Sequence, residues 1–124
     1  FAGRVAIVTG GGSGIGRCTA HELAALGASV ALLGRRIERL EAVRAEIAAA
    51  GGSASVHACD IRDEERVRDT ISAILAAHGR IDVLVNNAGG QFPAQLAGIS
   101  AKGWDTVGRN NLTGGFLVSR ESFR

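Results

Sequence analysis

Four short runs of apolar residues alternate along the chain with longer segments in which apolar residues recur every three or four positions. The runs cover residues 5–8, 30–33, 53–58 and 83–85, and the third is the least apolar. Continuous apolar runs are typical of strands that are buried on both faces. The recurrence between them is typical of amphipathic helices and covers residues 15–26, 37–50 and 64–78. The pattern therefore predicts strands and helices in strict alternation.

Residues at the ends of these segments support the assignment. Gly27, Gly51 and Gly79 follow the three helices, as C-terminal caps do, and Asp63 is a suitable N-terminal cap for the third helix. Alternation with short connections implies right-handed crossovers and a parallel sheet. We expect an α/β fold: a doubly wound, Rossmann-type parallel sheet in three αβα layers. Residues 1–124 would form one domain and contain the sheet only in part.

Beyond Pro93 the pattern becomes weaker. A loop leads to a helical region that begins near residue 100 and continues to the last residue. We expect Trp104 to anchor this region to the core. Four glycines within the region argue against an uninterrupted helix, because glycine disfavours helix interiors; they are Gly103, Gly108, Gly114 and Gly115.

Composition limits the kinds of partner. Apolar residues make up 46% of the 124 residues and charged residues 21%, as in ordinary globular domains. Basic and acidic residues are interspersed and the formal net charge is +2, so no basic face for nucleic acid is indicated. The sequence contains no run of 18 apolar residues, so it does not indicate a membrane span. Cys18 and Cys59 lack metal-site spacing and are expected to be reduced thiols. We therefore expect no metal, nucleic acid or membrane partner and a cytoplasmic location.

A glycine-rich loop joins the first predicted strand to the first predicted helix. Five of the seven residues from Gly10 to Gly16 are glycines, which is more than a tight turn needs. Such a turn lets the backbone approach a pyrophosphate, and the N-terminus of the following helix offers unpaired N–H groups to it. The loop therefore predicts phosphate binding at the carboxyl end of the first strand.

Two common phosphate-binding motifs fit this loop poorly. The spacing G-x-G-x-x-G is absent at every register. A P-loop nearly fits residues 11–18, but Arg17 replaces its lysine and Cys18 its Mg²⁺-binding hydroxyl residue. Loss of both functional side chains argues against nucleotide triphosphate hydrolysis.

The loop has the form T-G-x-x-x-G-x-G from Thr9 to Gly16, and Asn86-Asn87-Ala88-Gly89 follows the fourth predicted strand. Together these motifs resemble the short-chain dehydrogenase/reductase family, over essentially the whole chain and about the first half of a family member. The resemblance implies an oxidoreductase and a set of cofactor-binding residues. That set comprises Gly10, Ser13, Gly14, Ile15 and Gly16 for the phosphates, Asp60 and Ile61 for the adenine, and Asn87, Ala88 and Gly89 beside the nicotinamide ribose.

The end of the second predicted strand bears on the choice between NAD and NADP. Gly34 stands where NAD-preferring relatives carry an aspartate, and Arg35 and Arg36 follow it. A carboxylate there would bind the ribose 2′-hydroxyl of NAD and repel a phosphate, whereas arginine can bind a 2′-phosphate. We expect NADP, with Arg35 as the main ligand of its 2′-phosphate and Arg36 assisting.

The resemblance also places one catalytic residue in this chain. Asn111 matches an asparagine that holds a water in the family's proton relay, helped by a helix kink. The family's serine and its Tyr-x-x-x-Lys segment have no match, because the chain contains no Tyr and its only Lys, Lys102, lies in another motif. We therefore expect a chain that is truncated before that segment and inactive alone, from a protein that forms homo-oligomers when intact.

Residues after the fourth strand suggest a branch and leave alternatives. Gly90-Gln91-Phe92 resembles the trans-2-enoyl-CoA and 2,4-dienoyl-CoA reductase branch, in which Gln91 and Phe92 would line the substrate entrance. The expected activity is hydride transfer between NADPH and a carbonyl or enoyl substrate, with acyl-CoA thioesters among the candidates. A non-catalytic dinucleotide-binding sensor or interaction module on the same scaffold is the main alternative. Another Rossmann-type enzyme, such as a methyltransferase, would explain the glycine loop alone.

Overall fold

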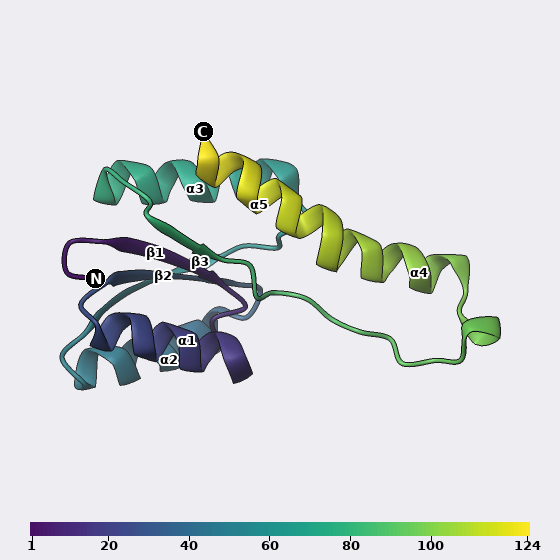
Figure 1. The fold of residues 1–124 in the computed structure, drawn as a ribbon, viewed down its shortest axis with the longest axis horizontal. Helices are drawn as coiled ribbons and strands as arrows, with labels where there is room; N and C mark the ends of the chain where they lie inside the picture. The colour runs from purple at the N-terminus through teal and green to yellow at the C-terminus, as the bar shows by residue number, and fades with distance from the viewer.

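The computed structural model describes residues 1–124 (Figure 1). Strands and helices alternate through the first two thirds of the chain, as predicted. They are β1 (Val5–Thr9), α1 (Gly14–Ala25), β2 (Ser29–Gly34), α2 (Ile37–Ala49), β3 (Ser53–Ala58), α3 (Glu64–His78) and β4 (Val83–Val85). The remaining elements are helical: η1 (Leu96–Gly98), α4 (Ala101–Gly108), η2 (Arg109–Thr113) and α5 (Gly114–Phe123).

The four strands form one parallel sheet in the order β3-β2-β1-β4. Helices α1 and α2 cover one face of the sheet, and α3 and α5 cover the other (Figure 1). The chain runs outward from β1 to β3 and then crosses back to place β4 on the far side of β1. This reversal confirms the predicted doubly wound α/β fold, and such reversals are where these sheets bind ligands.

The core has two halves, one on each face of the sheet, and β1 belongs to both. Val5 and Ile7 pack toward α3 and α5, whereas Ala6 and Val8 pack toward α1 and α2. All four side chains are buried, which explains why β1 reads as a continuous apolar run.

Both predicted caps of α3 are present. The Asp63 side chain accepts a hydrogen bond of 3.1 Å from the backbone N–H of Arg66. Gly79 ends the helix with φ at 74°, a left-handed conformation that favours glycine. These interactions could be predicted from the sequence because each involves residues within one helical turn.

The last third of the chain differs from the prediction. The four glycines do not interrupt the helix, because α4 continues into α5 through the π-helical segment η2. Gly114 is needed for packing: a Cβ on it would lie 2.6 Å from Cδ1 of Ile61. Segment 91–100 and α4 extend away from the sheet (Figure 1). Trp104 on α4 is 67% exposed, so the expectation that it anchors this region to the core is wrong. None of the helices combines the length and apolar character that a membrane crossing requires.

The carboxyl ends of β1 and β4 are joined by side-chain hydrogen bonds. The Thr9 hydroxyl accepts the backbone N–H groups of Asn87 at 3.0 Å and Ala88 at 2.9 Å. In return, Nδ2 of Asn87 donates to the carbonyls of Thr9 at 3.1 Å and Gly10 at 3.2 Å. The segment after β4 is therefore fixed against the start of the glycine loop.

We expect Thr9→Val to lower the free energy of unfolding of the full-length protein by about 2 kcal/mol, because it leaves two N–H groups without their acceptor. Thr9→Ser keeps the hydroxyl and should cost less than about 1 kcal/mol for the lost methyl group. Chemical denaturation measures both. A valine variant as stable as the serine variant would contradict the role of this hydroxyl.

Candidate functional site

Two adjoining cavities open at the carboxyl ends of the strands. The larger, which we call the outer cleft, has a volume of ≈ 600 Å³ and is lined by Gly10, Gly12, Ser13, Gly34, Arg35, Arg36, Arg39 and Leu40. The smaller, the inner pocket, has ≈ 140 Å³ and is lined by Gly10, Leu33, Gly34, Arg35, Cys59, Asp60, Ile61, Ala88, Gly89 and Asn110. Gly10, Gly34 and Arg35 line both, so the cavities form one continuous surface across the point where strand order reverses.

The glycine loop has the conformation that a close backbone approach requires. Gly10 has φ at 65°, and a Cβ on it would lie 2.9 Å from Nδ2 of Asn87. Gly16 is buried where α1 passes the carbonyl of Gly10. The first turn of α1 contains no acidic side chain, and the side chain of Ser13, its N-cap, makes no capping hydrogen bond. The N-terminus of α1 is therefore free to bind an anion.

The predicted loop residues are divided between two surfaces. Gly10 and Ser13 line the outer cleft. Gly14 and Ile15 instead border a shallow hollow on the outer side of α1, and the Ile15 side chain is 78% exposed. The structure thus brings part of the predicted phosphate cradle into the cleft and leaves Ile15 beside it.

Three arginines border the outer cleft. Arg35 and Arg36 were predicted to lie there, and both are exposed. Arg39 was not predicted as a site residue; it lies in the first turn of α2, whereas Arg35 precedes that helix. No motif in the sequence indicated Arg39, because its place on the cleft depends on the packing of α2 against Gly12.

Asp60 lies in the inner pocket and is held by Arg62. The guanidinium donates from Nε to Oδ1 at 3.0 Å and from Nη2 to Oδ2 at 2.7 Å, and the Arg62 backbone N–H also donates to Oδ1. These side-chain hydrogen bonds lower the pKa of Asp60 to about 2, against the opposing effect of partial burial. The carboxylate is therefore a charged acceptor at neutral pH. Ile61, also predicted, is buried beside it.

The segment after β4 completes the inner pocket. Ala88 and Gly89 line the pocket as predicted, whereas Asn87 serves the link to Thr9. Asn110, which was not predicted as a site residue, lines the pocket as well.

The Asn111 side chain forms hydrogen bonds with the segment after β4 and does not line the inner pocket. Its Oδ1 accepts the N–H of Gly90 at 2.9 Å, and its Nδ2 donates to the carbonyl of Gly90 at 2.6 Å. Both polar ends of the side chain are therefore hydrogen-bonded to one residue of the segment after β4. Asn111 itself lies within the π-helical segment η2.

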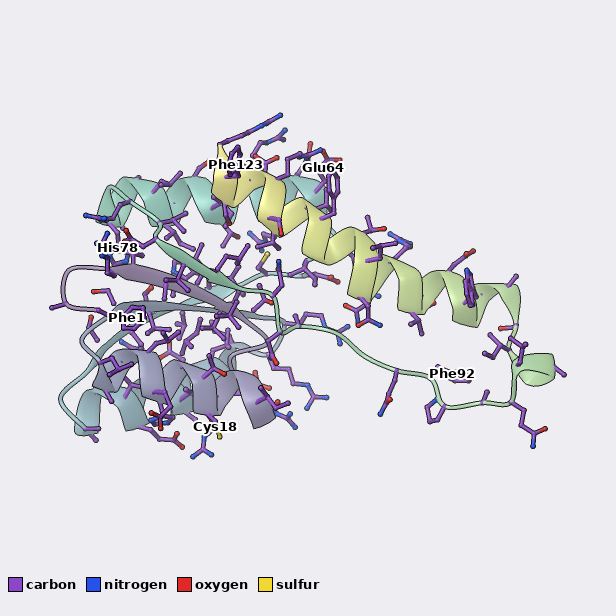
Figure 2. All side chains as sticks on the ribbon, in the orientation of Figure 1. Phe1, Cys18, Glu64, His78, Phe92 and Phe123 are labelled. Atoms are coloured by element: carbon purple, nitrogen blue, oxygen red, sulfur yellow. The ribbon has the colours of Figure 1, made fainter.

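A fourth hollow lies between the extended segment and α4. It has a volume of ≈ 390 Å³, and Gln91, Phe92, Lys102 and Val107 are among its lining residues. Phe92 is 61% exposed and lies well away from the sheet (Figure 2). Both residues predicted for a substrate entrance thus border a cavity that is separate from the outer cleft.

Solved structures with the same fold show strong similarity in sequence. The citronellol catabolism dehydrogenase AtuB of Pseudomonas aeruginosa PAO1 is 63% identical, with a TM-score of 0.96 over 99% of this chain and 50% of its own. A metagenomic short-chain oxidoreductase in complex with NADP is 45% identical, with a TM-score of 0.92 over 98% of this chain and 55% of its own. An NAD⁺-bound xylitol dehydrogenase is 36% identical, with a TM-score of 0.95 over 98% and 47%.

The curated relatives include a probable 2,4-dienoyl-CoA reductase of Bacillus subtilis, which is 35% identical over 98% of this chain and 48% of its own length. The chain spans about half the length of the curated relatives it matches. The family model described as short chain dehydrogenase matches residues 4–124. Every residue that builds the sheet, the outer cleft and the inner pocket falls within that match, and the chain therefore belongs to the short-chain dehydrogenase family.

Proposed function

We propose that this chain is the cofactor-binding half of an NADP-dependent oxidoreductase. The observation that carries the proposal is the outer cleft: arginines and no carboxylate line it, at the end of the strand where cofactor preference is decided. The 2′-phosphate of NADP would lie against Arg35, assisted by Arg36. The complex of a 45% identical relative with NADP supports this choice, although the family also includes an NAD⁺-bound xylitol dehydrogenase.

The rest of the cofactor would follow the continuous surface of the two cavities. The pyrophosphate would lie at the N-terminus of α1, against Gly10 and Ser13 in the outer cleft and the adjoining backbone of Gly14, Ile15 and Gly16. The adenine would lie in the inner pocket, where the Asp60 carboxylate accepts from its amino group and Ile61 packs near its ring. Asn87, Ala88 and Gly89 would border the nicotinamide ribose. When bound, the nicotinamide supplies or accepts the hydride.

The substrate we propose is a carbonyl or enoyl compound with an apolar portion, an acyl-CoA thioester among the candidates. Phe92 and Val107 give the hollow beside α4 apolar walls. The names of two relatives, a citronellol catabolism dehydrogenase and a probable 2,4-dienoyl-CoA reductase, support an apolar substrate. Asn111 would place a backbone-bound water for proton transfer. The acid/base tyrosine and its lysine would come from the part of the whole protein that this chain does not span.

We also propose that the whole protein is a homo-oligomer. Leu112, Phe116 and Phe123 are exposed along η2 and α5, and apolar side chains of this kind suit association between copies. Sedimentation of the full-length protein measures its oligomeric state.

Arg35→Asp should weaken NADPH binding to the full-length protein by about 100-fold, because it removes a charge-assisted contact and adds repulsion. NADH binding should change less than about threefold, since its 2′-hydroxyl carries no charge. The matched control is Arg44→Asp, on the helix that follows Arg35 but paired with Glu41 outside the cleft. Titrations monitored by cofactor fluorescence measure all the affinities. Equal losses for the two cofactors would overturn the assignment of the 2′-phosphate.

Asp60→Asn should weaken NADPH and NADH alike, by about tenfold, because adenine is common to both cofactors. In the folded protein the pKa of Asp60 is lowered from its ordinary value to about 2. The carboxylate therefore stays charged and contributes to cofactor binding at neutral and mildly acidic pH, and this contribution is lost only as the pH falls toward 2. The wild-type contribution of Asp60 should therefore stay constant from pH 8 to pH 5. A loss confined to NADPH would show that Asp60 acts on the phosphate and not on adenine.

A further inference from the structure

The arginines of the outer cleft differ from most others in the chain, because they have no acidic partner. Seven arginines form ion pairs with carboxylates: Arg4, Arg17, Arg44, Arg62, Arg80, Arg120 and Arg124. Arg35, Arg36 and Arg39 stand within five residues of one another and form none. Their guanidinium groups are thus available to a ligand.

The position of these arginines is unfavourable without an anion. They surround the N-terminus of α2, where the helix dipole presents a partial positive charge and disfavours cations. The only acidic side chain in the first turn is Glu38, and it does not line the cleft. A bound dianion would relieve the mutual repulsion of the three arginines and would also be favoured by the dipole.

Arg39 and Arg35 lie on different sides of the outer cleft. Arg35 lines both cavities, and its positive charge contributes to the lowered pKa of Asp60. Arg39 lines only the outer cleft and packs against the glycine loop: a Cβ on Gly12 would lie 3.0 Å from the Cβ of Arg39. Glycine at position 12 thus lets the first turn of α2 come close to the loop, which brings Arg39 to the loop side of the cleft.

We propose that Arg39 is a specificity-determining residue that binds the 2′-phosphate of NADP from the loop side, opposite Arg35. This inference rests on the proposed function. A phosphate dianion has enough oxygens to accept from two guanidinium groups at once, and each planar guanidinium offers paired donors. Gly12 positions Arg39 by leaving room for α2. NAD gains nothing from Arg39, since it has an uncharged hydroxyl at the same place.

The test is Arg39→Gln in the full-length protein, with Arg44→Gln as the matched control on the same helix. Isothermal titration with 2′,5′-ADP and with 5′-ADP probes the phosphate without the nicotinamide, and NADPH and NADH are titrated in parallel. We expect Arg39→Gln to weaken 2′,5′-ADP and NADPH by about tenfold, as for loss of a charge-assisted hydrogen bond. It should change 5′-ADP and NADH less than about twofold, and Arg44→Gln should leave all four ligands within that range.

Other results separate the inference from the function on which it rests. If wild-type protein binds 5′-ADP as tightly as 2′,5′-ADP and NADH as tightly as NADPH, the NADP proposal fails and the role of Arg39 fails with it. If wild type prefers the phosphorylated ligands and Arg35→Asp abolishes that preference while Arg39→Gln retains it, only the role of Arg39 is overturned. Equal losses for all four ligands in Arg39→Gln would likewise overturn it, because they would place Arg39 on a part shared by both cofactors.

Discussion

The two cavities at the carboxyl ends of the strands depend on the hydrogen bonds that link Thr9 and Asn87. One hydroxyl accepts two backbone N–H groups after β4, and one side-chain amide returns two hydrogen bonds to the end of β1. The backbone pairing of β1 with β4 ends at Val8 and Val85, so these side-chain hydrogen bonds hold together the segments that follow the last paired residues. At the opposite end of β1, the Asp82 carboxylate accepts the N–H of Val5, so side chains join the two segments at both ends.

The shape and charge of the cleft follow from this arrangement. With the ends of β1 and β4 held together, Gly10 lies against Asn87, and the glycine loop has to turn away from the sheet before α1 begins. The outer cleft opens beside that turn, at the end of β2, and the inner pocket opens where the segments that follow β2, β3 and β4 come together. The sheet fixes where the cavities lie, and the arginines give the outer cleft its charge. Relatives with the same fold can therefore bind different cofactors by changing the side chains that line the cavities.

Much of the fold could be predicted from the sequence, because its determinants are local. Strands buried on both faces give continuous apolar runs, and Asp63 and Gly79 act within one helical turn. The π-helical segment, the pairing of Asn111 with Gly90 and the exposure of Trp104 could not, since each depends on how distant segments meet. The same limit applies to the site. Arg35 was predicted from its place after a strand, whereas the position of Arg39 on the outer cleft depends on the approach of α2 to Gly12.

We propose that this chain forms the NADP-binding half of a short-chain dehydrogenase. The dissociation constants of NADPH and NADH from the wild-type, full-length protein, measured under identical conditions, test this proposal. An uncompensated arginine cleft predicts that NADPH binds at least about tenfold more tightly, a preference that should diminish at high salt. Equal binding, or tighter binding of NADH, would contradict the account.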